Sequence, residues 1–348
     1  MSLLNVGKIV ASQGIAIPSV STANRPVSPL TGSIIYNTTL KLWEQWDGSN
    51  WIPVTGGSIT ATGGTISYIS GYKIHTFTGD GNFSVNGTGL VEYLIVAGGG
   101  GGGAWVGGGG GAGGMLYGVT TISSNTYPVI IGSGGTAEYN PGSYGGMPRA
   151  TNGGNSSIFG ITALGGGRGG SWSSFPATSG GSGGGNGYSY GGAAGTSGQG
   201  FPGGQGRGAS ANGYPTGGGG GAGGPGENWS SVKSGDGGPG VSSNISGTSR
   251  FYSGGGGGGI HGSSTASNAV PGLGGIGGGG QGDRPTVNAG TSNPNNTSQL
   301  NGNTTHPTGE SGFPNTGGGG GGSGSGGGQQ SQGGAGGSGI VIVRYRIF

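Results

Sequence analysis

The sequence predicts an all-β protein: a small N-terminal β-meander, then a β-sandwich-like base with interleaved glycine-rich segments of polyglycine-II type, and no helix. Three observations predict this class. Glycine accounts for 104 of the 348 residues and gathers in contiguous runs. Stretches of β-branched and aromatic residues lead into those runs or follow them. Apolar residues nowhere recur with the 3.6-residue period of an amphipathic helix.

Composition excludes several classes of protein. Charged residues make up 6% of the chain, against about 25% in ordinary globular domains. The glycines are contiguous rather than at every third position, which excludes collagen. The net charge of +3 comes from scattered single residues, so no basic cluster indicates a nucleic-acid partner. Cysteine is absent, and with it disulfides and thiolate metal sites.

The first 56 residues differ from the rest of the chain. Short apolar patches are followed by a proline-punctuated stretch and then by three strand-like stretches, at 33–36, 40–46 and 51–54. A meander of this size cannot stand alone, so we expect it to pack on the next domain, on a second copy or on a larger assembly. The N-terminus lacks the basic and apolar regions of a secretory signal, and no apolar stretch is long enough to span a membrane.

Residues 57–348 are interpreted as one glycine-rich domain. Strands of its base are expected at about 66–97, 115–131, 157–164 and 339–348, with glycine-rich segments and loops over 98–338. The stretch 91–97 becomes apolar on both faces before it enters glycine, and the C-terminal stretch shows the reverse order. Laid antiparallel, these two strands would bring their glycine ends together. His75 lies in an alternating stretch and is expected at the surface.

The glycine runs admit two interpretations. An isolated run is a flexible linker, because glycine loses the most conformational entropy on ordering. Many runs interleaved with strands favour an ordered bundle of polyproline-II-type helices, whose N–H and C=O groups all point outward. Without Cβ atoms, neighbouring helices can approach closely enough to satisfy those groups. We favour the ordered bundle.

Catalytic chemistry finds little support in the sequence. The nine carboxylates form no local pair for acid–base work, and the three histidines lack metal-ligand spacing. No nucleophile motif occurs, and no phosphate-loop lysine follows any glycine run. We therefore expect no enzyme activity, no catalytic residue, no bound metal and no cofactor.

Aromatic side chains in the loops between glycine segments are the positive functional signal. Such rings offer flat, rigid contact area at low entropy cost, and with Asn, Ser and Thr beside them they suit sugar rings or protein loops. The alternative is that they only cap the bundle. The candidate receptor-binding residues are Tyr139, Tyr144, Trp172, Phe175, Tyr188, Tyr190, Phe201, Tyr214 and Trp229.

The two ends of the glycine-rich domain form a distinctive pair. Residues 91–100 are a strand that runs into glycine, and residues 337–345 run from glycine into a strand. With the internal runs at 251–254 and 315–317, they resemble the glycine-rich domain of tailed-bacteriophage tail-fibre and adhesin proteins. The stretch 25–51 is similar to small β modules of phage tail proteins.

This resemblance implies a virion protein, made in the host cytoplasm and acting outside the cell. Residues 1–56 would attach a homotrimer to other virion proteins, and the loops would contact a host surface glycan or outer-membrane protein. Neither nucleic-acid binding nor membrane insertion is expected. The alternative is a purely structural virion protein (neck, head-fibre or capsid decoration) without receptor binding, and a depolymerase is the least favoured reading.

Overall fold

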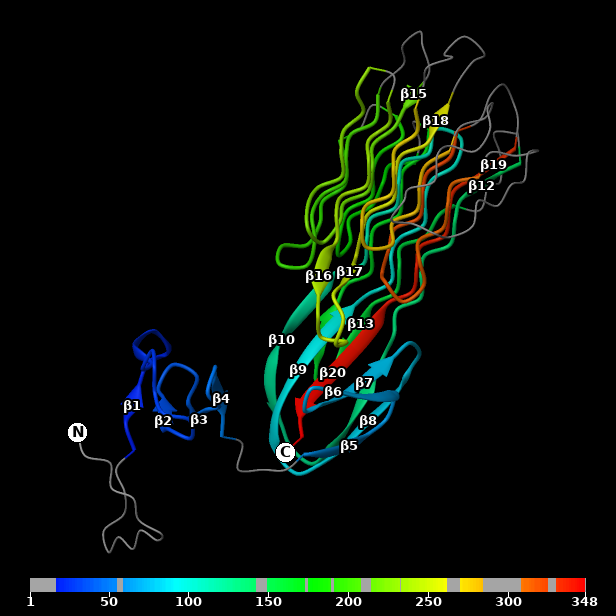
Figure 1. Ribbon diagram of the computed structural model, residues 1–348. Helices are drawn as coiled ribbons and strands as arrows, with labels where there is room; N and C mark the ends of the chain where they lie inside the picture. The colour runs from blue at the N-terminus through cyan, green and yellow to red at the C-terminus, as the bar shows by residue number, and fades with distance from the viewer. Residues whose placement is uncertain are drawn as a thin grey trace, which may run out of the picture.

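The computed structural model describes residues 17–54, 59–141, 149–172, 175–188, 191–207, 214–231, 233–261, 270–283, 308–324 and 330–347. Figure 1 shows an N-terminal module, a base of broad strands and a long bundle of extended segments that rises from the base. Within the described residues, the only helical element is a three-residue 3-10 turn, Thr22–Asn24. The all-β class predicted from the sequence is confirmed.

The N-terminal module is one four-stranded sheet in the order β1-β2-β3-β4. The expected meander corresponds to its last three, antiparallel strands, β2 (Ile34–Asn37), β3 (Leu42–Trp46) and β4 (Trp51–Pro53). The sequence did not reveal β1 (Ser19–Val20), which pairs parallel to β2. The apolar patch at residues 6–10 lies outside the described residues.

A buried ion pair organises the module. Glu44 of β3 is 1% exposed, and its carboxylate accepts hydrogen bonds from Arg25 Nε and Asn37 Nδ2, each at 2.8 Å. A carboxylate buried in so small a sheet requires such partners, because an unpaired buried charge is strongly destabilising. Arg25 thereby fixes the proline-rich segment before β2 against the sheet.

The base is a sandwich of two sheets. The larger has the order β10-β9-β20-β7-β6, and the smaller has the order β11-β8-β5. Their bounds are Thr60–Thr62 (β5), Thr65–Ile69 (β6), Tyr72–Phe77 (β7), Gly81–Asn86 (β8), Gly89–Val96 (β9), Met115–Ile122 (β10), Asn125–Val129 (β11) and Ile340–Arg346 (β20). As predicted, β9 and β20 are antiparallel, and Ile340 stands opposite Val96, so their glycine ends meet.

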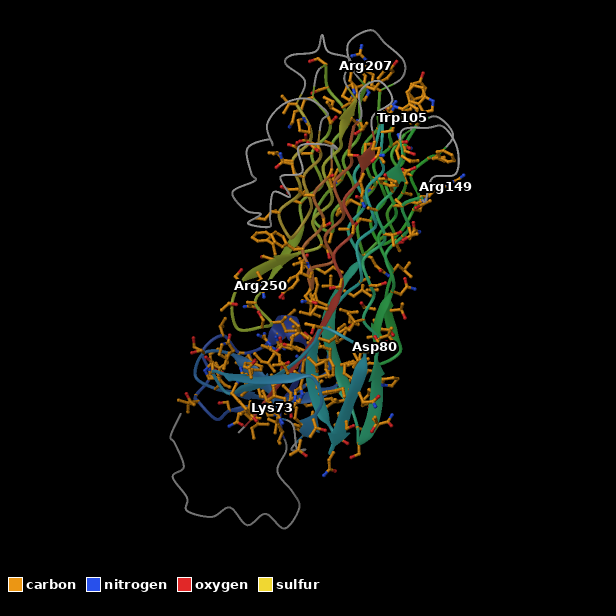
Figure 2. The ribbon with its side chains drawn as sticks, turned by 90° about the vertical axis from the view of Figure 1, so that its right-hand side faces the viewer. Lys73, Asp80, Trp105, Arg149, Arg207 and Arg250 are labelled. Carbon is orange, nitrogen blue, oxygen red and sulfur yellow. The ribbon has the colours of Figure 1, made fainter. Side chains whose placement is uncertain are left out.

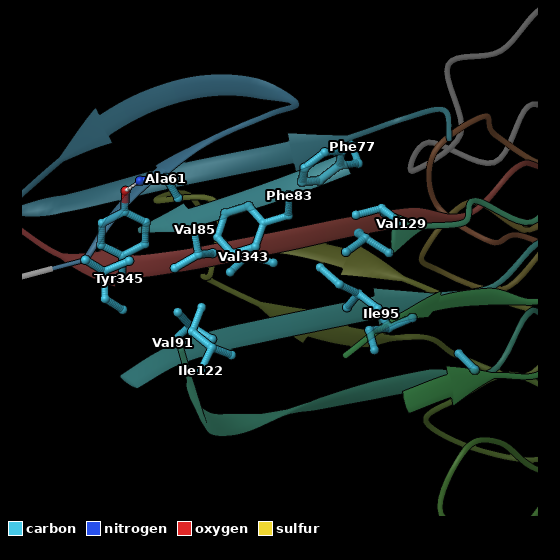
Figure 3. Packing of buried hydrophobic residues seen from close by; sticks show 14 of the residues in the cluster. Ala61, Phe77, Phe83, Val85, Val91, Ile95, Ile122, Val129, Val343 and Tyr345 are labelled. Atoms are coloured by element: carbon cyan, nitrogen blue, oxygen red, sulfur yellow. Dashed lines mark hydrogen bonds between the residues drawn. The ribbon is translucent and has the colours of Figure 1, made fainter. Parts of the chain in front are cut away.

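Both faces of the large sheet are buried near its centre. One face packs on the small sheet around Phe77, Phe83 and Val343. Figure 3 shows this core, in which the amide of Ala61 donates a hydrogen bond to the hydroxyl oxygen of Tyr345 at 3.0 Å. The other face is covered by the hairpin of β16 (Val241–Ser243) and β17 (Arg250–Tyr252). Burial on two sides explains why β9 and β20 are apolar on both faces.

His75 was expected at the surface, and this expectation is wrong. The side chain is fully buried between the two sheets, where its ring meets Phe83 edge-on at 5.0 Å and stacks on Tyr345 at 5.7 Å. Nδ1 lies 2.7 Å from the carbonyl oxygen of Gly63, so it carries the proton and donates. Burial lowers the pKa of His75, which favours the neutral ring.

The prediction of a single strand over 157–164 is also wrong, because the chain forms a hairpin there. β13 (Ser156–Ile158) pairs with β14 (Ile161–Ala163). The two turn residues, Phe159 and Gly160, have φ values of +57° and +75°. Positive φ at both central residues is typical of a two-residue hairpin turn. Glycine adopts this conformation readily, but a phenylalanine in the sequence gives no indication of it.

The glycine runs form an ordered bundle, and the segment 98–103 lies at its centre. All six of its N–H groups donate to antiparallel neighbours, and all six of its carbonyls accept from parallel neighbours, at N···O distances of 2.8–3.2 Å. The acceptor segments are 108–111, 151–154 and 334–337, and the donor segments are 135–138, 166–169 and 320–323. Each neighbour is contacted at every third residue, which is the repeat of a polyglycine-II helix.

Close packing of these helices requires glycine at most central positions. A Cβ built on any residue from Gly98 to Gly103 would collide with a backbone carbonyl of a neighbouring segment. The collisions rotate around the helix with the same three-residue period, because Gly98 and Gly101 face one neighbour and Gly99 and Gly102 face another. The flexible-linker interpretation is therefore wrong for these runs, whose backbone groups are satisfied inside the molecule.

Candidate binding site at the tip of the bundle

The end of the bundle farthest from the base is called the tip here. Glycine segments rise from the base to the tip, the chain turns back there over 104–107, and the short strand pairs β12–β19 and β15–β18 lie at the same end (Figure 1). These pairs join Tyr139–Asn140 to Ser331–Gln332 and Tyr214–Pro215 to Ile260–His261. Figure 2 shows Trp105, Arg149 and Arg207 at the tip, and Lys73 and Asp80 at the base.

Four rings from four separate segments meet at the tip and form the tip aromatic cluster: Trp105, Trp172, Tyr188 and Tyr214. Trp105 stacks on Trp172 with ring centroids 5.8 Å apart and an interplanar angle of 20°. Trp172 also lies 4.8 Å from Tyr188 and 5.6 Å from Tyr214. All four side chains are half-buried, so each keeps part of its ring surface open to solvent.

The turn that bears Trp105 is costly to form. Trp105 adopts a φ of +68°, a left-handed conformation that costs a non-glycine residue about 1–3 kcal/mol. Its amide donates to Ser331 Oγ at 3.1 Å, and Val106 forms a bridge with Gly324. Surrounding segments thus hold the tryptophan in a conformation that glycine would adopt without strain.

A buried carboxylate supports both tryptophans of the cluster. Glu138 is 2% exposed; its Oε2 accepts from the amide of Ala104 at 3.0 Å, and its Oε1 accepts from Ser171 Oγ at 3.1 Å. These two partners immediately precede Trp105 and Trp172. Glu138 therefore fixes the two tryptophan-bearing turns relative to each other.

Burial raises the pKa of Glu138 above that of an ordinary glutamate. The hydrogen bonds from Ala104 and Ser171 oppose this shift, as do the positive charges of Arg168 and Arg149. Desolvation is the largest effect, because the carboxyl group lies within the bundle rather than on its surface.

Two arginine–aromatic pairs flank the cluster. The guanidinium carbon of Arg149 lies 4.0 Å from the ring centroid of Phe175, whose amide donates to the carbonyl of Trp172 at 2.9 Å. On the other side, the guanidinium of Arg207 lies 4.9 Å from the ring centroid of Trp229. The amide of Arg207 donates to the carbonyl of Pro215, next to Tyr214, at 3.0 Å. A backbone hydrogen bond thus joins each arginine–aromatic pair to a turn of the cluster, and the two pairs and the cluster are together called the row.

The remaining candidate residues are distributed differently. Tyr139 lies at the tip in β12, and its hydroxyl donates to Gln330 Oε1 at 3.0 Å. Phe201 is separated from the rest: it follows a turn at the base end of the bundle, where Gln199 accepts from the amide of Met115 at the start of β10. Tyr144 and Tyr190 lie outside the described residues.

Sequence reasoning missed four components of this site: Trp105, Glu138, Arg149 and Arg207. Trp105 had a usable signal, because Ala104–Val106 is a three-residue interruption between two glycine runs and so marks a turn. Glu138 had none. Its role depends on contacts with Ala104 and Ser171, each more than thirty residues away.

The described part of the chain contains neither a cluster of metal-binding side chains nor a membrane-spanning helix. No group of three or more His, Asp or Glu side chains gathers there as a metal centre would require. Over the same residues, the structure contains no helix with the length and apolarity needed to cross a bilayer.

The fold and the tip define a class: an all-β protein in which a rigid polyglycine bundle presents aromatic and cationic side chains at one end. The chain belongs to the glycine-rich domain family, whose model matches residues 76–346. Residues 1–67 match a phage tail-like trimerisation region. No curated protein matches the chain. The two family matches together indicate a phage tail-associated fibre protein, a component of the virion, and the second supports a homotrimer.

Proposed function

We propose that this protein is an adhesin that contacts the host cell surface through the tip of its glycine bundle. The observation that supports this proposal most is that the N-terminal module and the tip lie at opposite ends of the molecule. The N-terminal module, which matches the trimerisation region, lies beside the base (Figure 1). The tip aromatic cluster and its flanking arginines lie at the opposite end. A protein fixed to the particle by its N-terminal part would present the tip outward.

The rigidity of the bundle supports the same proposal. The backbone groups of its central segment are satisfied by neighbouring segments, so the tip turns are anchored on a scaffold with little freedom to rearrange. Pre-organised aromatic side chains bind with a smaller loss of conformational entropy than flexible ones. A purely structural protein of the virion neck or capsid surface would not require aromatic side chains held rigidly at the tip.

A binding assay on intact cells tests the proposal. Purified full-length protein, fluorescently labelled, is incubated with a panel of candidate bacterial hosts, and bound fluorescence is measured. Binding to at least one host should be saturable and should fall about tenfold or more for the double variant Phe175→Ala/Trp229→Ala. Phe251→Ala removes an exposed ring of β17, away from the tip, and is the matched control. Absence of binding to every host would favour the purely structural role.

The absence of enzyme activity is part of the proposal. Two of the described carboxylates near the tip are engaged structurally, Glu138 with two turn residues and Asp236 with Lys233 at 2.7 Å. Prolonged incubation of the protein with extracted host polysaccharide should release no oligosaccharide. Released fragments, detected by size-exclusion chromatography, would assign a depolymerase instead.

A further inference from the structure

The row of rings and cations at the tip has a chemical character that narrows the class of ligand. Its centre is the tip aromatic cluster, whose exposed ring surfaces suit the C–H face of a pyranose ring. Its ends are the Arg149–Phe175 and Arg207–Trp229 pairs. In Figure 2, Trp105 lies between Arg207 and Arg149. A ligand that spans the row would meet stacking surfaces in the middle and positive charge on both sides.

Among the described residues, the carboxylate in contact with the cluster's turns is Glu138, and it does not offset this charge at the surface. Glu138 is buried beneath the turns, its oxygens are occupied by Ala104 and Ser171, and burial raises its pKa. Among the described residues, Glu227 is an exposed carboxylate two residues before Trp229, and its Oε2 lies 3.8 Å from Lys233 Nζ. The ends of the row itself are guanidinium groups, and that of Arg207 also donates to the carbonyl of Ser231 at 3.3 Å. Guanidinium groups bind carboxylate and phosphate oxygens with charge-assisted hydrogen bonds.

We propose that the row formed by Arg149, the tip aromatic cluster and Arg207 is a binding site for an acidic saccharide chain, with pyranose rings on the aromatic surfaces and carboxylate or phosphate substituents on the two arginines. This inference rests on the proposed adhesin function and specifies its ligand. A host polysaccharide that bears uronic acids and one that bears phosphate share this chemistry, and the experiment below distinguishes them.

An outer-membrane protein is a less suitable partner for the row. A protein interface of ordinary size buries roughly 800 Å² on each partner and relies on an apolar centre that excludes charge. Here the rings stack mainly on one another, only parts of them are exposed, and a cation stands at either end. A narrow chain with alternating sugar faces and acidic groups fits such a strip better.

The test measures binding of the full-length protein to polysaccharide extracted from the host cells that it recognises. Three preparations are used: native, carboxyl-reduced and dephosphorylated. The native polysaccharide should bind, and one of the two charge-stripped preparations should bind about tenfold or more weakly, which identifies the acidic group. Raising the salt concentration should weaken binding of the native preparation, because the exposed charges are screened.

Variants locate the site. Arg149→Gln/Arg207→Gln should lower affinity about tenfold or more and reduce the salt dependence, and Arg149→Lys/Arg207→Lys should restore part of both. Trp172→Ala should lower affinity without reducing the salt dependence. Arg250→Gln removes an exposed arginine far from the tip and should leave binding unchanged (Figure 2). Thermal melting of each variant separates loss of binding from loss of folding.

The outcomes separate this inference from the adhesin proposal. If all three polysaccharide preparations bind equally, or if Arg250→Gln weakens binding as much as the double variant, the acidic-saccharide site is wrong and the adhesin function stands. The same holds if protease treatment of the cells abolishes binding while extracted polysaccharide binds nothing, because the ligand is then a protein. If the protein binds no host cell at all, the adhesin function itself fails.

Discussion

At the scale of single residues, glycine in this protein is a packing requirement more than a source of flexibility. A Cβ at Gly101 would collide with the carbonyl of Thr136 in a neighbouring segment, and backbone cannot move aside as a side chain can. Gly79 differs, because a Cβ there would meet nothing within 4 Å and its φ is not positive. Neither glycine has a positive φ, so a comparison of the two positions measures the packing role of glycine alone.

Gly101→Ala should destabilise the protein by at least about 1–3 kcal/mol, the usual cost of overpacking a tight interior. The cost should fall at the upper end of this range, because every helix around the centre would have to shift. Gly79→Ala should change the free energy of unfolding by no more than about 0.5 kcal/mol. Scanning calorimetry of the two variants measures the difference; equal melting temperatures would contradict the packing argument.

Glu138 is the second residue with a sharp prediction, because its raised pKa links stability to pH. Between the unfolded-state pKa near 4.5 and the higher folded-state pKa, the folded protein binds more protons than the unfolded chain. The contribution of Glu138 to stability is therefore fully present below the unfolded pKa and decreases as pH rises through the folded pKa. Glu138→Gln removes this titration and keeps an acceptor for the amide of Ala104.

The melting temperature of Glu138→Gln relative to wild type should accordingly rise between pH 4 and pH 8. Glu227→Gln, which removes an exposed carboxylate near the tip, is the matched control and should show no comparable trend. A difference between Glu138→Gln and wild type that stays constant over this pH range would mean that burial does not control the ionisation of Glu138.

At the scale of elements, the strands that could be predicted are those whose pattern is local. β9 and β20 can be recognised because their residues are apolar on both faces and glycine follows at one end. Their antiparallel pairing follows from the opposite order of strand and glycine in the two segments. The turn at Phe159 carried only a weak signal, because its backbone conformation is unusual for phenylalanine. The burial of His75 depends on β8 and β20, which lie elsewhere in the sequence.

The bundle shows why the rest could not be predicted. Glycine runs have no side chains, so nothing in the segment 98–103 encodes which segments surround it. The partners are set by the strands and turns at the two ends. For the same reason the sequence could suggest an aromatic tip but could not show that Trp105, Trp172, Tyr188 and Tyr214 meet there, or that Phe201 lies at the other end.

The central strand β20 should be the most sensitive element of the base. Ile342 is 1% exposed in the core beneath the β16–β17 hairpin, so Ile342→Ala should cost about 2–5 kcal/mol through lost burial and a cavity. Val119→Ala, on the exposed face of β10, should cost no more than about 0.5 kcal/mol. Denaturant unfolding measures both. Similar midpoints for the two variants would show that β20 does not anchor the sheet.

At the scale of the whole molecule, the two parts of the chain differ in self-sufficiency. The glycine-rich domain has its own core between two sheets, and the backbone groups of its central helix are satisfied within one chain. The N-terminal module is a single small sheet, and Val27 is 94% exposed, Leu30 66% and Leu40 50%. We expect these side chains to be covered by other subunits, because this part of the chain matches a trimerisation region.

Full-length protein should therefore sediment as a homotrimer, in line with the trimerisation region matched by residues 1–67. A fragment of residues 57–348 should be monomeric and should keep a melting transition close to that of the full chain, because the bundle and the sandwich do not depend on the module for their hydrogen bonds. Sedimentation equilibrium and calorimetry on the two proteins provide the measurement. A trimeric fragment would move the subunit contacts to the base or the bundle, and an unfolded one would show that trimerisation stabilises the glycine domain.

In particles, deletion of residues 1–56 should abolish incorporation of the protein, and an unchanged number of copies per virion would contradict attachment through this module.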